Sequence, residues 1–132
     1  MTVSDFRDLR VYQGAFEAAA QLFEVTKGFP REERYSLTDQ VRRSSRAICT
    51  NIAEAWRKRR YPAAFISKLS DADTEAAETQ VWLDIALRCE YLNDDLHEDL
   101  SSRYNHICAQ LVRMINDADR WCGNSPNDHP PR

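Results

Sequence analysis

The chain has few of the residues that break helices and none of the alternation that marks strands. It contains only three glycines among 132 residues, and apolar and polar residues nowhere alternate with the period of a half-buried strand. No apolar run approaches the roughly 20 residues needed to cross a bilayer. The N-terminal stretch is charged and lacks the apolar core of a secretory signal. These absences disfavour β-rich, membrane-spanning and secreted proteins.

The sequence also lacks the patterns that are typical of metal sites and disulfide frameworks. The four cysteines form no C-x-x-C pair, and the three histidines fall in no zinc-like spacing with them. We therefore expect free, mostly buried thiols in a reducing, cytoplasmic setting, with no metal and no cofactor. The four cysteines are Cys49, Cys89, Cys108 and Cys122, and the three histidines are His97, His106 and His129.

Charge is unevenly distributed along the chain, although the net charge is only −3. Residues 36–60 carry seven Lys or Arg against two acids, and residues 71–99 carry ten acids against one Arg. A local basic patch on a chain of opposite net charge indicates recognition at one surface rather than general coating of a polyanion.

Apolar spacing of three and four residues predicts four helices, at about residues 5–27, 36–58, 62–88 and 93–123. Gly28 and Pro30 end the first helix, and Ser36 or Thr38 caps the second, Ser36 with Asp39 resembling a short capping box. Pro62 suits the first turn of the third helix.

Short connections between long amphipathic helices predict an all-α, antiparallel up-down-up-down four-helix bundle. The bundle is expected to occupy residues 1–123, with a flexible C-terminal tail at 124–132. Small residues on the second and third helices should let those two helices approach closely. The predicted core comprises Leu9, Phe16, Phe23, Val41, Ile48, Ile52, Phe65, Leu69, Leu83, Ile107, Leu111 and Ile115.

The segment Gln40–Arg60 divides into an apolar face and a basic face on a helical wheel. Guanidinium groups in a row suit phosphates, and four of the cations fall where the helix ends, near the negative end of its dipole. Nearby Trp56, Tyr61 and Phe65 are aromatic groups of the kind that stack on bases. The predicted nucleic-acid-binding residues are Arg42, Arg43, Arg46, Arg57, Lys58, Arg59 and Arg60.

Another interpretation of the same stripe involves no nucleic acid. Asp71, Glu75 and Glu78 lie on one side of the third helix, at positions i, i+4 and i+7. The arginines then either serve solubility or pair with these acids, on a neighbouring helix or between subunits, as in a protein-interaction scaffold.

The third helix carries a second apolar group, beside its core stripe, that an isolated monomer does not need. Val81, Trp82 and Ile85 cluster there, and Trp121 adds a further aromatic group near the C-terminus. Clustered aromatic and β-branched residues favour a buried protein contact over scattered exposure. We therefore predict self-association through Val81, Trp82 and Ile85.

Catalytic patterns are weak, and we expect no enzymatic activity. A di-iron bundle needs two Glu-x-x-His motifs, whereas this chain offers only Asp94-x-x-His97. There is no glycine-rich phosphate loop, no evident small-molecule substrate site, and no spacing that suggests a nucleophile and its base.

One motif, Asn51-Ile52-Ala53-Glu54, lies at the margin between the two faces of the basic helix. The Asn51 amide either points to solvent or, with the Glu54 carboxylate, bonds across to a partner helix and fixes its register. Further motif pieces lie before and after it in the sequence, at residues 8–12, 29–38, 40–48 and 89–92.

With these pieces in unbroken order from about Phe6 to Ile115, the chain resembles the four-helix-bundle proteins related to those encoded within intervening sequences of large-subunit ribosomal RNA genes. That family includes the accessory variability determinant of diversity-generating retroelements. The resemblance implies a homopentamer and an RNA, ribonucleoprotein or reverse transcriptase partner. Cys49 and Ala55 depart from the family pattern, which often has Pro and Gly there; the extra methyl of Ala55 is expected to shift the spacing between the second and third helices slightly.

Overall fold

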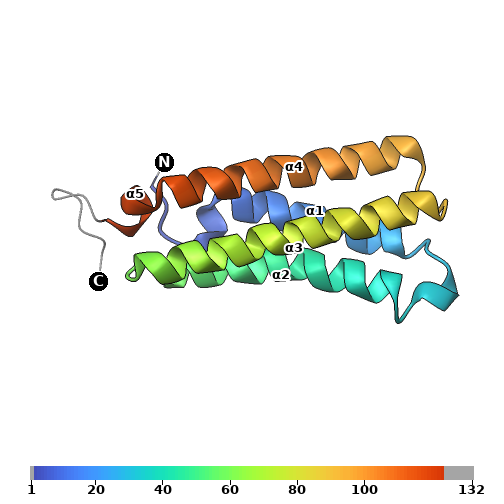
Figure 1. Cartoon of the computed structure of the whole chain (residues 1–132), viewed down its shortest axis with the longest axis horizontal. Coiled ribbons are helices and arrows are strands. Elements are labelled where there is room, and N and C mark those ends of the chain that lie inside the picture. The colour runs from blue at the N-terminus through green and yellow to red at the C-terminus, as the bar shows by residue number, and fades with distance from the viewer. Residues whose placement is uncertain (1, 124–132) are drawn as a thin grey trace.

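The computed structural model describes residues 2–123, which contain helices and turns but no strand. The long helices are α1 (Arg10–Thr26), α2 (Leu37–Arg57), α3 (Pro62–Arg88) and α4 (Asp94–Asn116). Shorter ones are the 3-10 turns η1 (Phe6–Asp8) and η2 (Arg31–Glu33) and the terminal helix α5 (Ala118–Cys122). The four long helices pack antiparallel (Figure 1), which confirms the predicted all-α bundle. The tail predicted at residues 124–132 lies outside the described residues.

Each long helix contacts two neighbours in the bundle. α1 packs against α2 and α4, while α3 packs against the same two helices from the other side. Among the described residues, α1 and α3 make no contact with each other, so they occupy diagonal positions. The α2–α3 pair forms the most extensive packing in the molecule.

Local chemistry explains where the helices begin and end. Asn93 caps α4, because its Oδ1 accepts a 2.8 Å hydrogen bond from the Leu96 N–H. Gly123 ends α5 in the left-handed conformation, with φ of 68°. Ser36 precedes α2 as predicted, but its hydroxyl donates to Glu33 Oε1 at 2.6 Å instead of capping the helix, so the predicted capping box was wrong. The fourth predicted helix is interrupted at Asp117, between α4 and α5.

The buried face of α1 differs from the predicted one. Phe16 and Phe23 are 53% and 38% exposed, so assigning them to the core was wrong. A second stripe with similar spacing is buried instead, and its small side chains let α1 lie close to its neighbours. On α4 a similar shift buries Met114 and leaves Ile115 half-buried. The buried stripe of α1 consists of Val11, Ala15, Ala18, Leu22 and Thr26.

Small side chains do line the α2–α3 contact, as predicted. Ser44, Ala55, Ala72 and Ala76 are fully buried. Ser44 Oγ and Thr79 Oγ1 lie 2.8 Å apart within this contact, and Thr79 also donates to the carbonyl oxygen of Glu75. The two hydroxyls therefore satisfy each other where the helices are too close for larger side chains.

Candidate nucleic-acid interface

The basic stripe of α2 is divided by the structure into groups with different surroundings. Arg42 is half-buried and turned towards α1. Its Nε donates a 2.8 Å hydrogen bond to Thr26 Oγ1, and its Nη2 lies 3.4 Å from the carbonyl oxygen of Phe23. Arg42 therefore fastens α2 to α1, and its donors are partly engaged within the protein.

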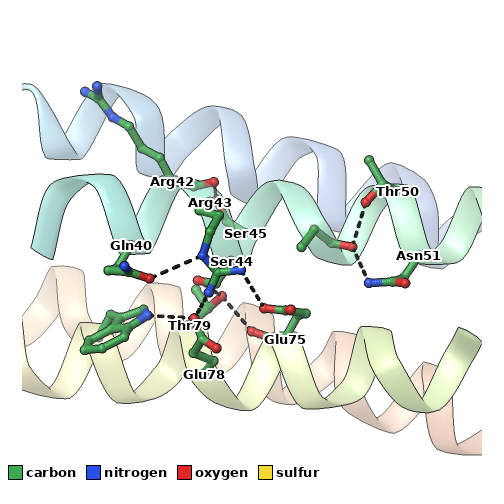
Figure 2. A network of polar contacts seen from close by, with 12 residues as sticks. Gln40, Arg42, Arg43, Ser44, Ser45, Thr50, Asn51, Glu75, Glu78 and Thr79 are labelled. Atoms are coloured by element: carbon green, nitrogen blue, oxygen red, sulfur yellow. Dashed lines mark hydrogen bonds and ion pairs between the residues drawn. The ribbon is translucent and has the colours of Figure 1, made fainter. Parts of the chain in front are cut away.

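Arg43, the next residue, is directed to a different helix. It forms ion pairs with Glu75, at 3.5 Å, and with Glu78, both on α3 (Figure 2). Glu78 also accepts a 3.2 Å hydrogen bond from the indole N–H of Trp82. Glu75 and Glu78, which the sequence offered as partners on a neighbouring helix or between subunits, therefore pair with Arg43 on a neighbouring helix of the same chain. Asp71 is exposed and makes no ion pair within residues 2–123.

Arg59 is the third cation with an internal role. Its guanidinium carbon lies 3.4 Å from the ring centroid of Trp56, and its Nε donates to the Trp56 carbonyl oxygen at 2.9 Å. Trp56 is buried and packs edge-on against Trp121, with ring centroids 6.2 Å apart. Burial lowers the pKa of Arg59 from its ordinary value. Trp121, which the sequence showed as a further aromatic group, is therefore part of this aromatic packing.

Four cations of the stripe remain exposed and form no ion pair within the described part of the chain. Three of them, Arg57, Lys58 and Arg60, gather where α2 ends, beside Tyr61, which is 58% exposed. The fourth, Arg46, lies further towards the start of the helix, with its guanidinium 5.9 Å from the ring centroid of Phe23. The stripe is thus two separate exposed groups rather than one continuous surface.

The Asn51–Glu54 motif has a structural role in the bundle. Glu54 forms a 3.0 Å ion pair with Lys68 across the α2–α3 contact, in agreement with the interpretation that it bonds to a neighbouring helix. The Asn51 amide instead donates to the Ala47 carbonyl oxygen of its own helix at 2.9 Å. Ile52 is fully buried and Ala53 half-buried.

Two other motif pieces, far apart in sequence, meet at one end of the bundle. Tyr91 donates a 2.9 Å hydrogen bond to Glu33, and its ring packs against Phe29 at 5.6 Å. The hydroxyl of Ser36, and after it that of Tyr91, lowers the pKa of Glu33. The same carboxylate raises the pKa of Tyr91 to about 12. This contact joins the α1–α2 connection to the α3–α4 connection.

The predicted self-association surface is largely accessible. Val81 and Ile85 are 51% and 39% exposed on the outer side of α3. Trp82 is half-buried against the core, and its indole N–H is bound to Glu78.

The cysteine and histidine side chains that the structure describes have separate surroundings. Residues 2–123 contain no group of three or more His, Cys, Asp or Glu side chains placed to hold a metal ion. Burial raises the pKa values of Cys49 and Cys108 to about 11, whereas Cys89 is exposed. His97 bonds to Asp84 at 2.8 Å rather than to Asp94. None of the predicted site residues lines the cavity of about 420 Å³ between the N-terminal segment, α1 and the α4–α5 end.

The order of the motif pieces and the bundle geometry agree with a comparison against known families. The profile described as 23S rRNA-intervening sequence protein matches residues 7–113. The chain belongs to the 23S rRNA-intervening sequence protein family. A crystal structure of an S23 ribosomal protein family member from Bacteroides thetaiotaomicron VPI-5482, a protein of unknown function, is similar, with a TM-score of 0.73 and 30% identity over 80% of this chain and 95% of that chain. No curated protein matches.

Membership of this family agrees with the resemblance found from the sequence motifs. Within the part of the chain that the structure describes, no helix combines the length and apolar character needed to cross a membrane.

Proposed function

We propose that this family member is a non-enzymatic adaptor that binds RNA, or a ribonucleoprotein, through the end of α2. The observation that carries the proposal is the group formed by Arg57, Lys58 and Arg60, which are exposed beside Tyr61 and unpaired within residues 2–123. Three cations within four positions suit adjacent phosphates, and an exposed aromatic ring suits a stacked base.

Electrostatics supports a local contact of this kind. The chain is net negative, and α3 together with the start of α4 is strongly acidic. Such a distribution repels a polyanion from most of the protein and leaves a basic end where it can bind. The family description refers to an intervening sequence of 23S rRNA, so RNA is the nucleic acid to test first.

Fluorescence anisotropy with a labelled 12-nucleotide single-stranded RNA tests this proposal. Replacing Arg57, Lys58 and Arg60 together by Gln should weaken binding at least tenfold at moderate salt. Each lost phosphate contact should also reduce the slope of log affinity against log salt by about 0.7. A matched control replaces the exposed Arg10, Arg88 and Arg113 by Gln. That variant has the same change in net charge and should retain most of the affinity.

Absence of binding by the unaltered protein, or equal affinity of both triple variants, would contradict the RNA-binding proposal. If oligomers form without any RNA binding, the protein is better described as a protein-interaction scaffold.

We also propose that the protein is a homo-oligomer, with Val81, Trp82 and Ile85 in or near the contact. The exposed Val81 and Ile85 side chains support this, because adjacent apolar groups on an outer helix face favour burial against a partner. The pentameric state is an expectation from the family resemblance. Light scattering that shows only the 15.3 kDa chain at micromolar concentration would contradict it.

A further inference from the structure

A second exposed apolar surface lies on α1, on residues that the sequence pattern placed in the core. Phe16 is 53% exposed and Phe23 is 38% exposed. Tyr12 packs beside Phe16, with the two ring centroids 6.0 Å apart. We name Tyr12, Phe16 and Phe23 the α1 aromatic face. Exposed phenylalanines two helical turns apart leave a large apolar area in water, which favours a protein partner.

The edge of the α1 aromatic face is positively charged. Around the Phe23 ring centroid lie the charged groups of Arg42 at 4.6 Å, Lys27 at 4.9 Å and Arg46 at 5.9 Å. Lys27 is paired with Glu24, and Arg42 is held by α1, but Arg46 is exposed and forms no ion pair among the described residues. A partner for this face should therefore combine apolar side chains with nearby carboxylates.

The outer surface of α3 combines apolar side chains with carboxylates, and the exposed Arg88 lies one turn beyond Ile85 at the end of the helix. Val81 and Ile85 are exposed, with Glu78 one turn before Val81 and Asp84 beside Ile85. Asp84 is the freer of the two carboxylates, with a side chain 70% exposed, although it bonds to His97. Asp71, also exposed, adds negative charge further along the same helix. We name Val81 and Ile85, with these acids around them, the α3 acidic face.

The two faces belong to helices that lie diagonally in the bundle and make no contact with each other. A contact between two α1 aromatic faces would place two basic edges in one interface, and a contact between two α3 acidic faces would place their carboxylates in one interface. Like charges at a contact disfavour both arrangements. Pairing one face with the other matches opposite charges and covers both apolar surfaces.

We propose that the α1 aromatic face of one copy binds the α3 acidic face of a second copy. This inference rests on the self-association proposed above and identifies the surface that Val81 and Ile85 contact. Because the two surfaces differ, each copy has one of each left to bind further copies, and the contact repeats until it closes into a ring or grows as a chain.

Two variants that each block one face test the inference. Phe16→Glu with Phe23→Glu places negative charge against the acidic partner face. Val81→Lys with Ile85→Lys places positive charge against the basic edge around Phe23. All four side chains are exposed, so both variants should retain the helical circular dichroism signal of the unaltered protein. Val112→Lys, at an exposed apolar position on α4 outside both faces, is the control.

Light scattering and native mass spectrometry at about 100 μM provide the measurement. Each blocked variant alone should be a monomer, whereas the control variant should keep the size of the unaltered protein. Mixed one to one, the two blocked variants should form a dimer containing one of each, because each still has the face that the other lacks. That mixed dimer is expected only if the contact joins unlike faces.

The remaining outcomes separate this inference from the proposals on which it rests. A monomeric unaltered protein refutes self-association and the inference together. An oligomer that persists in the variant carrying Phe16→Glu and Phe23→Glu refutes the role of the α1 face alone. A loss of RNA affinity in that variant, without a change in oligomer size, also refutes that role. Blocked variants that each form a homodimer show that like faces meet, and two monomeric variants that do not pair when mixed refute the pairing of these two faces.

Discussion

The hydroxyl of Tyr91 donates a 2.9 Å hydrogen bond to the carboxylate of Glu33, two residues separated by 58 positions in the chain. Phe29 packs against the Tyr91 ring, and Ser36 holds the other oxygen of the Glu33 carboxylate. This one contact therefore ties together the two connections at the same end of the bundle. It brings together motif pieces that are far apart in the sequence.

Tyr91→Phe should lower the melting temperature at pH 7, with an effect that disappears at high pH. The pKa of folded Tyr91 is raised to about 12, above the value of about 10 for an unfolded tyrosine. A raised folded pKa contributes stability that is present below about pH 10 and is lost as the pH rises towards about 12. Thermal melts between pH 7 and 11 should show the difference from the unaltered protein shrinking above pH 10.

Glu33 has the opposite dependence. Its pKa is lowered in the folded protein, so its contribution is present above about pH 4.3 and is lost as the pH falls through the lowered value. Tyr35→Phe is the matched control for Tyr91→Phe, because the Tyr35 side chain is 84% exposed and its hydroxyl can be removed with little effect on the melting temperature. A difference between Tyr91→Phe and the unaltered protein that stays constant at all pH values would contradict the hydrogen bond.

Ile52→Asp should abolish the folded state, whereas Phe16→Ser should not. Ile52 is fully buried in α2, and an unpaired carboxylate there loses its hydration without gaining a partner. Phe16 is 53% exposed, so a serine there creates no cavity in the core. Far-ultraviolet circular dichroism at 222 nm distinguishes the two variants. An unfolded Phe16→Ser chain would place that side chain in the core after all.

Arg59 should differ from its three basic neighbours in stability measurements. Arg59→Gln removes the guanidinium from the Trp56 ring and the hydrogen bond to the Trp56 carbonyl oxygen. We expect the free energy of unfolding to fall by about 1 kcal/mol. Arg57→Gln, Lys58→Gln and Arg60→Gln should each change it by less than about 0.5 kcal/mol. Urea denaturation measures all four, and equal effects would show that Arg59 is not specially packed.

Cysteine alkylation should be selective for Cys89. Cys89 is exposed, whereas Cys122 is buried and the burial of Cys49 and Cys108 raises their pKa values to about 11. At pH 7.5 these two thiols therefore contain very little of the reactive thiolate. Mass spectrometry after brief exposure to iodoacetamide should show one modification, at Cys89. Cys89→Ser is the control, and this variant should lose the modification without gaining one at another cysteine.

The sequence by itself determined the class of fold and most of the helix positions. Pro62 begins α3 and the fourth helix starts at Asn93 as predicted, because these effects depend on a residue and its immediate neighbours. The apolar spacing of α2 and α3 also identified their buried faces, since each has one dominant stripe. The motif pieces, read in order, indicated the family.

Only the tertiary structure decided which face of α1 is buried and how the cations of α2 are used. The stripe through Phe16 and Phe23 and the stripe through Ala15 and Leu22 have similar helical spacing, so periodicity cannot separate them. The close approach of α2 and α4 selects the smaller side chains. Likewise Arg42 and Arg43 are adjacent in sequence, yet one bonds to α1 and the other to α3. The partner of a charged side chain depends on which helices lie beside it, and that follows from packing rather than from local sequence.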